Sequence, residues 1–384
     1  MPRWPADVAK RLQEATIRAD DHFDAVRRRF DAKFSRNRPL YIEVYRGFAD
    51  ASGVELQGRV LSQAPLGAPK AEDGWWDNLF DAYRRFESDE VPGVPLRASF
   101  RGASAEAISD HEGYYQFRMA TAGEPSDALW DRASISLLDG TLPTPQPVLQ
   151  IGPAAKFGVI SDIDDTVLYS GVTDWKMAAR LLFLHNARTR KPLKGVAKLY
   201  RALQSGADGG GRNPIFYVSS SPWNLYDLLE DFFEVNSIPF GPVYLRDYGT
   251  DVDKFLASKG HGHKLERARE LIHRLPGLPW VLIGDSGQAD AEIYAELARE
   301  FGDRILAIYI RDVDLEAETE RDRYVDGFIE KIAGTRVPML RVADSSVIAT
   351  HALGLGLIAE ASLPGIAEEV RLDQNRPGPS EADR

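Results

Sequence analysis

The sequence predicts an α/β protein in which a parallel sheet with flanking helices follows an N-terminal helix and a small β-sandwich. Three observations indicate this order. A helical apolar pattern covers residues 5–36, short alternating segments follow between residues 39 and 150, and buried-strand-sized apolar runs separated by helical sequence occupy much of the remainder. A chain of 384 residues has room for about two domains of roughly 150 residues each.

Residues 1–38 are predicted to form an amphipathic helix. Apolar residues recur at intervals of three and four, as Phe23, Val26, Phe30 and Phe34 do. Ten basic and six acidic side chains leave this segment with a local excess of four positive charges. Such a helix could contact anionic lipid, but its interleaved acidic residues weaken the basic face and favour a helix packed on the protein with a solvated charged face.

Residues 39–150 are predicted to form a β-sandwich accessory domain. Alternation begins at Leu40, Ile42 and Val44 and recurs over residues 54–61, 95–101, 114–119 and 133–138. A short helical pattern runs from Trp76 to Phe86, and the segment at 110–118 is similar to a turn and strand of transthyretin-like modules. No catalytic constellation is evident in this region.

Residues 151–370 are predicted to form the parallel α/β domain, and residues 371–384 a polar, disordered tail. Apolar runs at 157–161, 215–219, 280–283 and 305–310 have the character of buried parallel strands. No apolar run is long enough for a transmembrane helix, and no signal-peptide pattern is present. We therefore expect a cytoplasmic protein, and this expectation is compatible with peripheral contact with a membrane.

Composition excludes several classes of function. The net charge of −11 disfavours a protein that mainly binds nucleic acid. The absence of cysteine excludes disulfide scaffolds, cysteine nucleophiles and thiolate metal sites. The segment Gly284-Asp285-Ser286-Gly287 superficially matches a serine-protease nucleophile, but the surrounding sequence predicts α/β structure rather than a β-barrel.

The strongest chemical signal is the segment Asp162-Ile163-Asp164-Asp165-Thr166, which ends a predicted buried strand. Three carboxylates in four residues repel one another and lose hydration there, so folding alone does not favour them. A divalent cation would stabilise them, and the carboxyl end of a strand is where open α/β sheets bind ligands. The alternative is an acidic turn that caps a helix.

Three weaker signals follow in sequence order. Ser219 ends the next predicted strand, Lys264 opens an amphipathic helix, and Asp285 and Asp290 follow another strand. Each alone has an ordinary structural explanation, such as a turn cap or a solvated helix lysine. Their order gives them weight: an acidic pair, a strand-end serine, a lysine and a second acidic pair.

This order resembles the four motifs of the haloacid dehalogenase (HAD) superfamily of phosphotransferases. The longer segments around these motifs, including Val218 to Leu225 and His263-Lys264-Leu265, resemble the phosphatidate phosphatase catalytic domain first named from an actin-patch protein. The resemblance covers roughly residues 150–320 and implies a HAD-like Rossmannoid fold. Ser220 and Asn224 depart from the family pattern, where Asn and Gln are usual, which bears on substrate contacts rather than on the core chemistry.

The resemblance implies specific roles. Asp162 would be the nucleophile that forms an aspartyl-phosphate, and Asp164 the general acid and base. Ser219 and Lys264 would contact the transferring phosphoryl group. The implied cofactor is Mg²⁺, held by Asp162, the Asp164 backbone carbonyl and Asp285, with Asp290 ordering a metal-bound water or a ligand.

The segment after the first motif bears on the substrate. Trp175, Lys176 and Arg180 belong to an apolar and basic stretch at 175–194 that would cover the catalytic aspartates. It could enter a bilayer and attract anionic phospholipid, or pack as an ordinary cap. Trp223 could line the pocket or staple the following helix. His263 could orient a phosphate, while a zinc site formed with His261 is disfavoured because no further ligand clusters nearby.

We therefore expect a Mg²⁺-dependent phosphatase that hydrolyses a phosphomonoester, with phosphatidate as the leading substrate. Two alternatives remain open from the sequence. The same fold could act on a soluble phosphomonoester such as a nucleotide or sugar phosphate, or the chain could be a noncatalytic scaffold built around the sandwich. The intact acidic pairs, Ser219 and Lys264 count against the scaffold.

Overall fold

The computed structural model describes residues 40–62, 91–121, 128–138, 142–163, 195–223, 226–246, 261–286, 289–312 and 319–374. Several sequence predictions lie outside these residues: the helix at 1–38, the helical pattern at 76–86, and the segment at 175–194. The described residues divide into two compact units, one up to Val148 and one from Leu149 onward.

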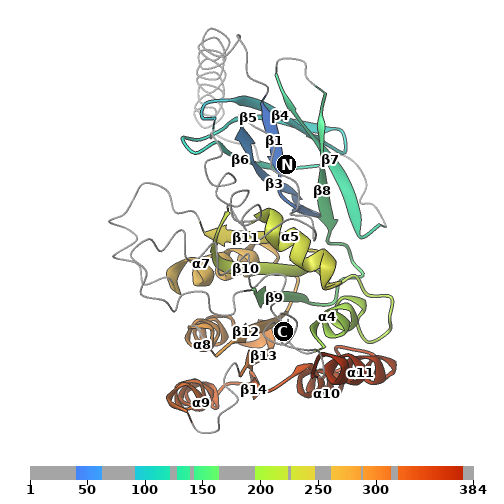
Figure 1. Cartoon of the computed structure of the whole chain (residues 1–384), viewed down its shortest axis with the longest axis vertical. Coiled ribbons are helices and arrows are strands. Elements are labelled where there is room, and N and C mark those ends of the chain that lie inside the picture. Colours follow the sequence, from blue (N-terminus) through green and yellow to red (C-terminus); the bar gives the residue numbers. More distant parts are fainter. Residues whose placement is uncertain are drawn as a thin grey trace, which may run out of the picture. The chain divides into compact units, whose positions relative to one another are not determined.

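The N-terminal unit is a hydrogen-bonded sheet of eight strands (Figure 1). The strands are β1 (Tyr41–Val44), β2 (Gly47–Asp50), β3 (Gly53–Leu61), β4 (Pro95–Phe100), β5 (Ala103–Ile108), β6 (Tyr114–Met119), β7 (Trp130–Leu137) and β8 (Thr144–Gln150). Their order is β1-β3-β2-β8-β7-β4-β5, and β6 pairs with β3. The long strand β3 pairs antiparallel with β1, β2 and β6, while β4 pairs antiparallel with β5 and β7.

One hydrophobic core serves this whole sheet. It brings together Leu56 from β3, Phe117 from β6, Leu96 from β4 and Ile135 from β7, each at most 3% exposed. Strands that lie far apart in the pairing order thus share one core, so the sheet is curled. The small all-β domain expected from the sequence is therefore one hydrogen-bonded, curled sheet.

Three strands of this unit, β2, β5 and β8, were not anticipated. In β8 the residues Pro145 and Pro147 mask the strand pattern, because proline lacks the backbone N–H that a sheet uses. Their spacing of two puts both missing N–H groups on the same side of the strand, so the other side keeps its donors. The strand β5 consists largely of alanine and serine, which carry little apolar signal.

The C-terminal unit is built on a parallel sheet of six strands (Figure 1). The strands are β9 (Gly158–Asp162), β10 (Ile215–Pro222), β11 (Val243–Arg246), β12 (Trp280–Asp285), β13 (Ile305–Arg311) and β14 (Met339–Val342). The order is β11-β10-β9-β12-β13-β14, and each neighbouring pair is parallel. The mixed α/β class is confirmed, and the four predicted apolar runs are its four central strands.

Helices cover both faces of this sheet. They are α4 (Val196–Ser205), α5 (Tyr226–Val235), α7 (His261–Arg274), α8 (Asp290–Phe301), α9 (Glu320–Ile332), α10 (Ser345–Gly354) and α11 (Leu363–Gln374), with short 3-10 helices η2 (Gly302–Arg304) and η3 (Glu360–Ser362). Helix α8 contacts both α7 and α9, and helices α4, α10 and α11 all contact one another. The two groups lie on opposite faces of the sheet (Figure 1). Among the described helices, none has the length and apolar character required to span a bilayer.

Helix α11 caps the beginning of helix α4. The N-cap residue of α4 is Gly195, which offers no side chain, and its first turn holds no acidic residue. The acids come instead from α11: Asp373 accepts the Gly195 N–H at 3.0 Å and Glu369 accepts the Lys198 N–H at 2.8 Å. Because α11 continues to Gln374, it includes the first four residues of the stretch that the sequence assigns to a disordered tail, which corrects that boundary.

We expect Asn213→Ala to destabilise the C-terminal unit by about 2–4 kcal/mol, because it orphans several buried backbone groups. Asn213 is fully buried; its side chain accepts the N–H groups of Lys156 and Phe157 at 2.8 and 3.3 Å and donates to the Leu203 carbonyl at 2.8 Å. These bonds join the entry of β9 to the end of α4. Urea unfolding measures the loss; a change below about 0.5 kcal/mol would contradict this role.

Candidate active site

The polar cluster of the C-terminal unit lies at the carboxyl ends of its three central strands. Strand β9 lies between β10 and β12, with Val218 opposite Asp162 and Ile283 opposite Ser161. Asp162 and Asp285 are the last residues of β9 and β12, and Ser219 lies one residue beyond Val218 in β10. Because parallel strands end at the same edge, the predicted strand-end residues are brought to one edge of the sheet, as in open α/β sheets that bind ligands.

A buried lysine links the two acidic motifs. The Lys264 ammonium nitrogen lies 2.8 Å from Asp162 Oδ1 and 3.1 Å from Asp290 Oδ1. All three side chains are nearly inaccessible, at 4%, 2% and 0% exposure. Lys264 lies in the first turn of α7, and Asp290 is the first residue of α8. Lys264 is common to both pairs, and its removal would leave two buried carboxylates without their cation, which is strongly destabilising, so this contact fixes both helices against β9.

Asp290 also organises the second acidic motif. Its Oδ2 accepts the backbone N–H of Asp285 at 3.1 Å, so the carboxylate at the start of α8 bridges back to the end of β12. A carboxylate in the first turn is also favoured by the helix dipole. Asp285 itself is 5% exposed.

Asp162, Asp285 and Asp290 form a cluster that could hold a metal ion. One carboxylate oxygen from each lies within 4.8 Å of the other two. With all three ionised and Lys264 protonated, this buried group carries a charge of −2. Such a charge is costly inside a protein unless it is neutralised, and three carboxylate oxygens are the donors that hard divalent cations prefer. The donor set therefore fits a divalent cation.

Position 284 must be glycine because Asp290 lies too close for any side chain. The sequence does not reveal this role of Gly284. A Cβ atom at this position would lie 2.5 Å from Asp290 Oδ2 and 2.6 Å from Asp290 Cβ. Any side chain would therefore displace the carboxylate that binds Lys264 and the Asp285 N–H. The glycine was visible in the motif, but only the fold shows which group it accommodates.

We expect Gly284→Ala to lower catalytic activity by about 10–100-fold, because displacement of a site carboxylate by about 1 Å costs on that order. The matched control is Gly262→Ala in the first turn of α7, where an added Cβ would meet no atom within 4 Å. Steady-state kinetics of both variants measure the effect. Equal activities of the two alanine variants would show that the Asp290 position tolerates displacement.

The remaining predicted residues are distributed around this edge. Ser219 is fully buried and Ser220 is half-buried. Trp223 is half-buried and its ring stacks on Tyr226, with centroids 6.2 Å apart and an interplanar angle of 30°. His263 is half-buried and precedes Lys264 in α7. Outside the described residues lie Asp164, Asp165, Thr166, Trp175, Lys176, Arg180 and Asn224.

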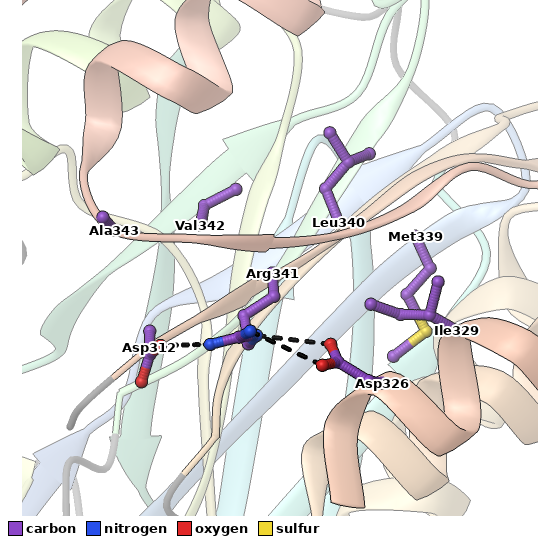
Figure 2. Close-up of a pocket in the computed structure, with 8 residues that line it drawn as sticks. All are labelled: Asp312, Asp326, Ile329, Met339, Leu340, Arg341, Val342 and Ala343. Atoms are coloured by element: carbon purple, nitrogen blue, oxygen red, sulfur yellow. Dashed lines mark hydrogen bonds and ion pairs between the residues drawn. The ribbon is translucent and has the colours of Figure 1, made fainter. Parts of the chain in front are cut away.

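A separate cavity of about 530 Å³ lies beside the edge strand β14 and shares no residue with the aspartate cluster (Figure 2). Arg341 of β14 points into this cavity between Asp312, which follows β13, and Asp326 of α9, at 2.7 and 3.3 Å. It also binds Asp322 at 2.8 Å. The arginine therefore joins α9 to the two last strands, which explains the acids here as structural partners.

The region of the chain that contains the aspartate cluster is similar to known proteins. Residues 157–312 match the sequence profile of the family described as "Phosphatidate phosphatase APP1, catalytic domain". The chain is 29% identical to phosphatidate phosphatase APP1 of Saccharomyces cerevisiae over 307 residues, which are 76% of this chain and 51% of that protein. It is 32% identical to an uncharacterized protein of Schizosaccharomyces pombe over 156 residues, 40% of this chain and 25% of that protein.

The chain thus spans about half the length of the yeast phosphatase and a quarter of the fission-yeast protein. Among solved structures, a carbohydrate acetylesterase from Xanthomonas citri matches with a TM-score of 0.30 and 9% identity, over 86% of this chain and 74% of that one. The family resemblance inferred from the sequence motifs is confirmed by the profile match.

Proposed function

We propose, from the membership of residues 157–312 in the APP1 phosphatidate phosphatase catalytic-domain family, that this chain is a divalent-metal-dependent phosphatase whose substrate is phosphatidate. The observation that carries this proposal is the buried contact of Lys264 with Asp162 and Asp290 beside Asp285. A nucleophilic carboxylate, a cation and a set of metal-binding oxygens occur together at the edge where such a sheet binds ligands.

The reaction assigned to the site proceeds in two displacements. A carboxylate oxygen of Asp162 attacks phosphorus, the bond from phosphorus to the glycerol oxygen breaks, and Asp164 gives its proton to the departing alkoxide. A water molecule then attacks the aspartyl-phosphate, Asp164 takes the proton from that water, and inorganic phosphate leaves as Asp162 is restored. The organic product is diacylglycerol.

Lys264 and Ser219 are assigned to the transferring phosphoryl group. The ammonium of Lys264 already lies against Asp162 Oδ1, so it is placed to neutralise charge that passes between the carboxylate and the phosphoryl oxygens. Ser219, buried at the neighbouring strand end, supplies a hydroxyl donor. Trp223 and His263 are assigned to the rim of the site as substrate contacts.

The metal that fits is Mg²⁺, held by Asp162, Asp285 and Asp290, with the Asp164 backbone carbonyl as a further ligand that the family resemblance implies. Bound there, Mg²⁺ would offset the −2 charge of the group and act as a Lewis acid toward the phosphate oxygens. The strand order β11-β10-β9-β12-β13-β14, with the nucleophile on a central strand, supports a HAD-like Rossmannoid domain over residues 151–370. We assign the chemistry to this domain and an accessory role to residues 39–150.

Phosphatidate is favoured over soluble phosphomonoesters because the family profile is that of a phosphatidate phosphatase. A phospholipid substrate implies that the enzyme reaches a membrane surface, and the apolar and basic sequence at 175–194 and the N-terminal residues 1–38 are the proposed points of peripheral contact. Both segments combine basic with apolar side chains, which suits an anionic lipid surface.

The proposal is tested by phosphate release from phosphatidate in mixed micelles, with and without Mg²⁺, beside a panel of soluble phosphomonoesters. Mg²⁺-dependent release from phosphatidate is the expected result. Release from soluble esters alone would retain the reaction and overturn the lipid substrate. No release from any phosphomonoester would overturn the enzymatic assignment and favour a scaffold.

A further inference from the structure

Two buried hydroxyl groups lie directly behind the proposed nucleophile. Tyr200 of α4 places its hydroxyl oxygen 2.7 Å from the hydroxyl oxygen of Ser161, the residue before Asp162 in β9. Both residues are buried, at 5% and 1% exposure. Neither is among the site residues that the sequence analysis singled out.

The geometry fixes which hydroxyl donates. The Ser161 hydroxyl donates to the backbone carbonyl oxygen of Asp162 at 2.8 Å. A serine hydroxyl has one proton, so Ser161 must accept from Tyr200, whose phenol is therefore the first donor. Burial, together with the nearby Asp162 charge, raises the pKa of Tyr200 to about 12. Tyr200 thus keeps its proton at neutral pH.

The chain of hydrogen bonds continues through one peptide group to the carboxylate. The carbonyl that Ser161 holds belongs to the peptide between Asp162 and Ile163, and the N–H of the same peptide donates to Asp162 Oδ1 at 2.8 Å. Because a peptide group is planar, fixing its carbonyl fixes the direction of its N–H. Asp162 Oδ1 is thereby held by the peptide on one side and by Lys264 on the other.

We call this chain of hydrogen bonds, from Tyr200 through Ser161 and the Asp162–Ile163 peptide to the Asp162 carboxylate, the relay. The relay connects the two faces of the sheet. Successive side chains of a strand point to opposite faces, so Ser161 faces α4 whereas Asp162 faces α7 and α8, where Lys264 and Asp290 lie. A side chain on the α4 face can therefore influence the Asp162 carboxylate through the intervening peptide. Helix α4 is itself held by the caps that α11 supplies, so the Tyr200 hydroxyl is presented from an anchored helix.

We infer that Tyr200 and Ser161 are positioning residues that hold the Asp162 carboxylate in its attacking orientation through the Asp162–Ile163 peptide. This inference rests on the proposed phosphatase function for its kinetic effect, but the orientation of the carboxylate also sets how well the cluster binds a cation. Bonds in such a chain polarise one another, so the loss of any member weakens the whole.

The test compares Tyr200→Phe, Ser161→Ala and the double variant with Tyr217→Phe as a matched control. Tyr217 is also a buried tyrosine on this face, with its ring centroid 6.4 Å from that of Tyr200, but its hydroxyl donates to the Pro239 carbonyl at 2.6 Å. We expect each relay variant to lower kcat for phosphatidate about tenfold with KM within about twofold, since misorientation acts on the chemical step. Tyr217→Phe should retain kcat.

Two further readouts separate positioning from simple loss of stability. The double variant should be no slower than Ser161→Ala alone, because residues of one chain of bonds are not additive, and Ser161→Thr should restore kcat. Titration calorimetry with MgCl₂, without substrate, should show about three- to tenfold weaker binding in the relay variants and unchanged binding in Tyr217→Phe.

The outcomes distinguish this inference from the proposed function. Weaker Mg²⁺ binding in the relay variants, together with a wild-type protein that hydrolyses no phosphomonoester, would support the relay and overturn the phosphatase. Unchanged Mg²⁺ binding and unchanged kcat in Tyr200→Phe and Ser161→Ala would overturn the relay. Additive losses in the double variant, without rescue by threonine, would also overturn it, because two independent packing defects would account for them.

Discussion

Replacement of Asp162 by asparagine should reduce phosphate release by at least about 10⁴-fold, the largest effect that any single substitution in this chain is expected to have. The amide nitrogen and oxygen of asparagine fill the same space but cannot form the covalent acyl phosphate. The Lys264 contact with Asp290 at 3.1 Å remains in the variant, so the fold keeps one arm of the buried ion pair. Single-turnover and steady-state phosphate release on phosphatidate measure the effect.

The matched control is Asp312→Asn. Asp312 also follows the end of a parallel strand, β13, and also binds a cation, Arg341, at 2.7 Å, but it lies outside the aspartate cluster. The control should keep the wild-type rate. Asp162→Asn should unfold without Mg²⁺ at or above the wild-type temperature, since the change removes one of three mutually repelling carboxylates. Substantial turnover by Asp162→Asn would remove Asp162 as the nucleophile.

The central strands of the C-terminal unit were predictable because they are buried on both faces. A strand covered by helices on both sides needs apolar residues at successive positions, and β9, β10, β12 and β13 show such runs. The sheet's two end strands, β11 and β14, were missed. Each has four residues and contains an arginine, so neither produces a continuous apolar run. Their pairing partners, rather than their own composition, make them strands.

The site was predictable to the extent that its chemistry is local in sequence. Asp162 was indicated by the carboxylates that crowd one strand end, and Asp285 and Asp290 by a second acidic pair. Lys264 had no local signal of its own, and only the order of the four motifs singled it out. Its burial between Asp162 of β9 and Asp290 of α8 explains why a lysine lies there, since two buried acids from different elements need a cation from a third.

Positions that act through packing could not be predicted. Tyr200 follows the ordinary helical pattern of buried residues in α4, and Ser161 is one polar residue within the apolar strand β9. Neither position stands out in the sequence. Their contact depends on how α4 docks against β9, which no spacing in the sequence encodes. The same holds for Gly284, whose neighbour Asp290 is six residues away in sequence but approaches it across the start of a helix.

Lys264→Met should lower turnover by about 10²–10³-fold, as expected for the loss of one preorganised charge at a phosphoryl-transfer site. The same change should strengthen Mg²⁺ binding about tenfold, because it makes the buried group more negative, from −2 to −3. Without Mg²⁺ the variant should lose about 3–5 kcal/mol of stability, since Asp162 and Asp290 stay buried without their cation. Titration calorimetry, thermal unfolding with and without MgCl₂, and kinetics at saturating Mg²⁺ measure these three effects.

Opposite changes in metal affinity and rate would identify the role of Lys264. A lysine that neutralises the transferring group competes electrostatically with the metal, so its removal helps binding and harms the reaction. A lysine that merely braces the carboxylates would, when removed, weaken metal binding and rate together, and that result would contradict the assignment. Arg341→Met is the control for general destabilisation, because Arg341 also serves three carboxylates, Asp312, Asp322 and Asp326, outside the cluster. It should lower the unfolding temperature while folded protein retains its kcat.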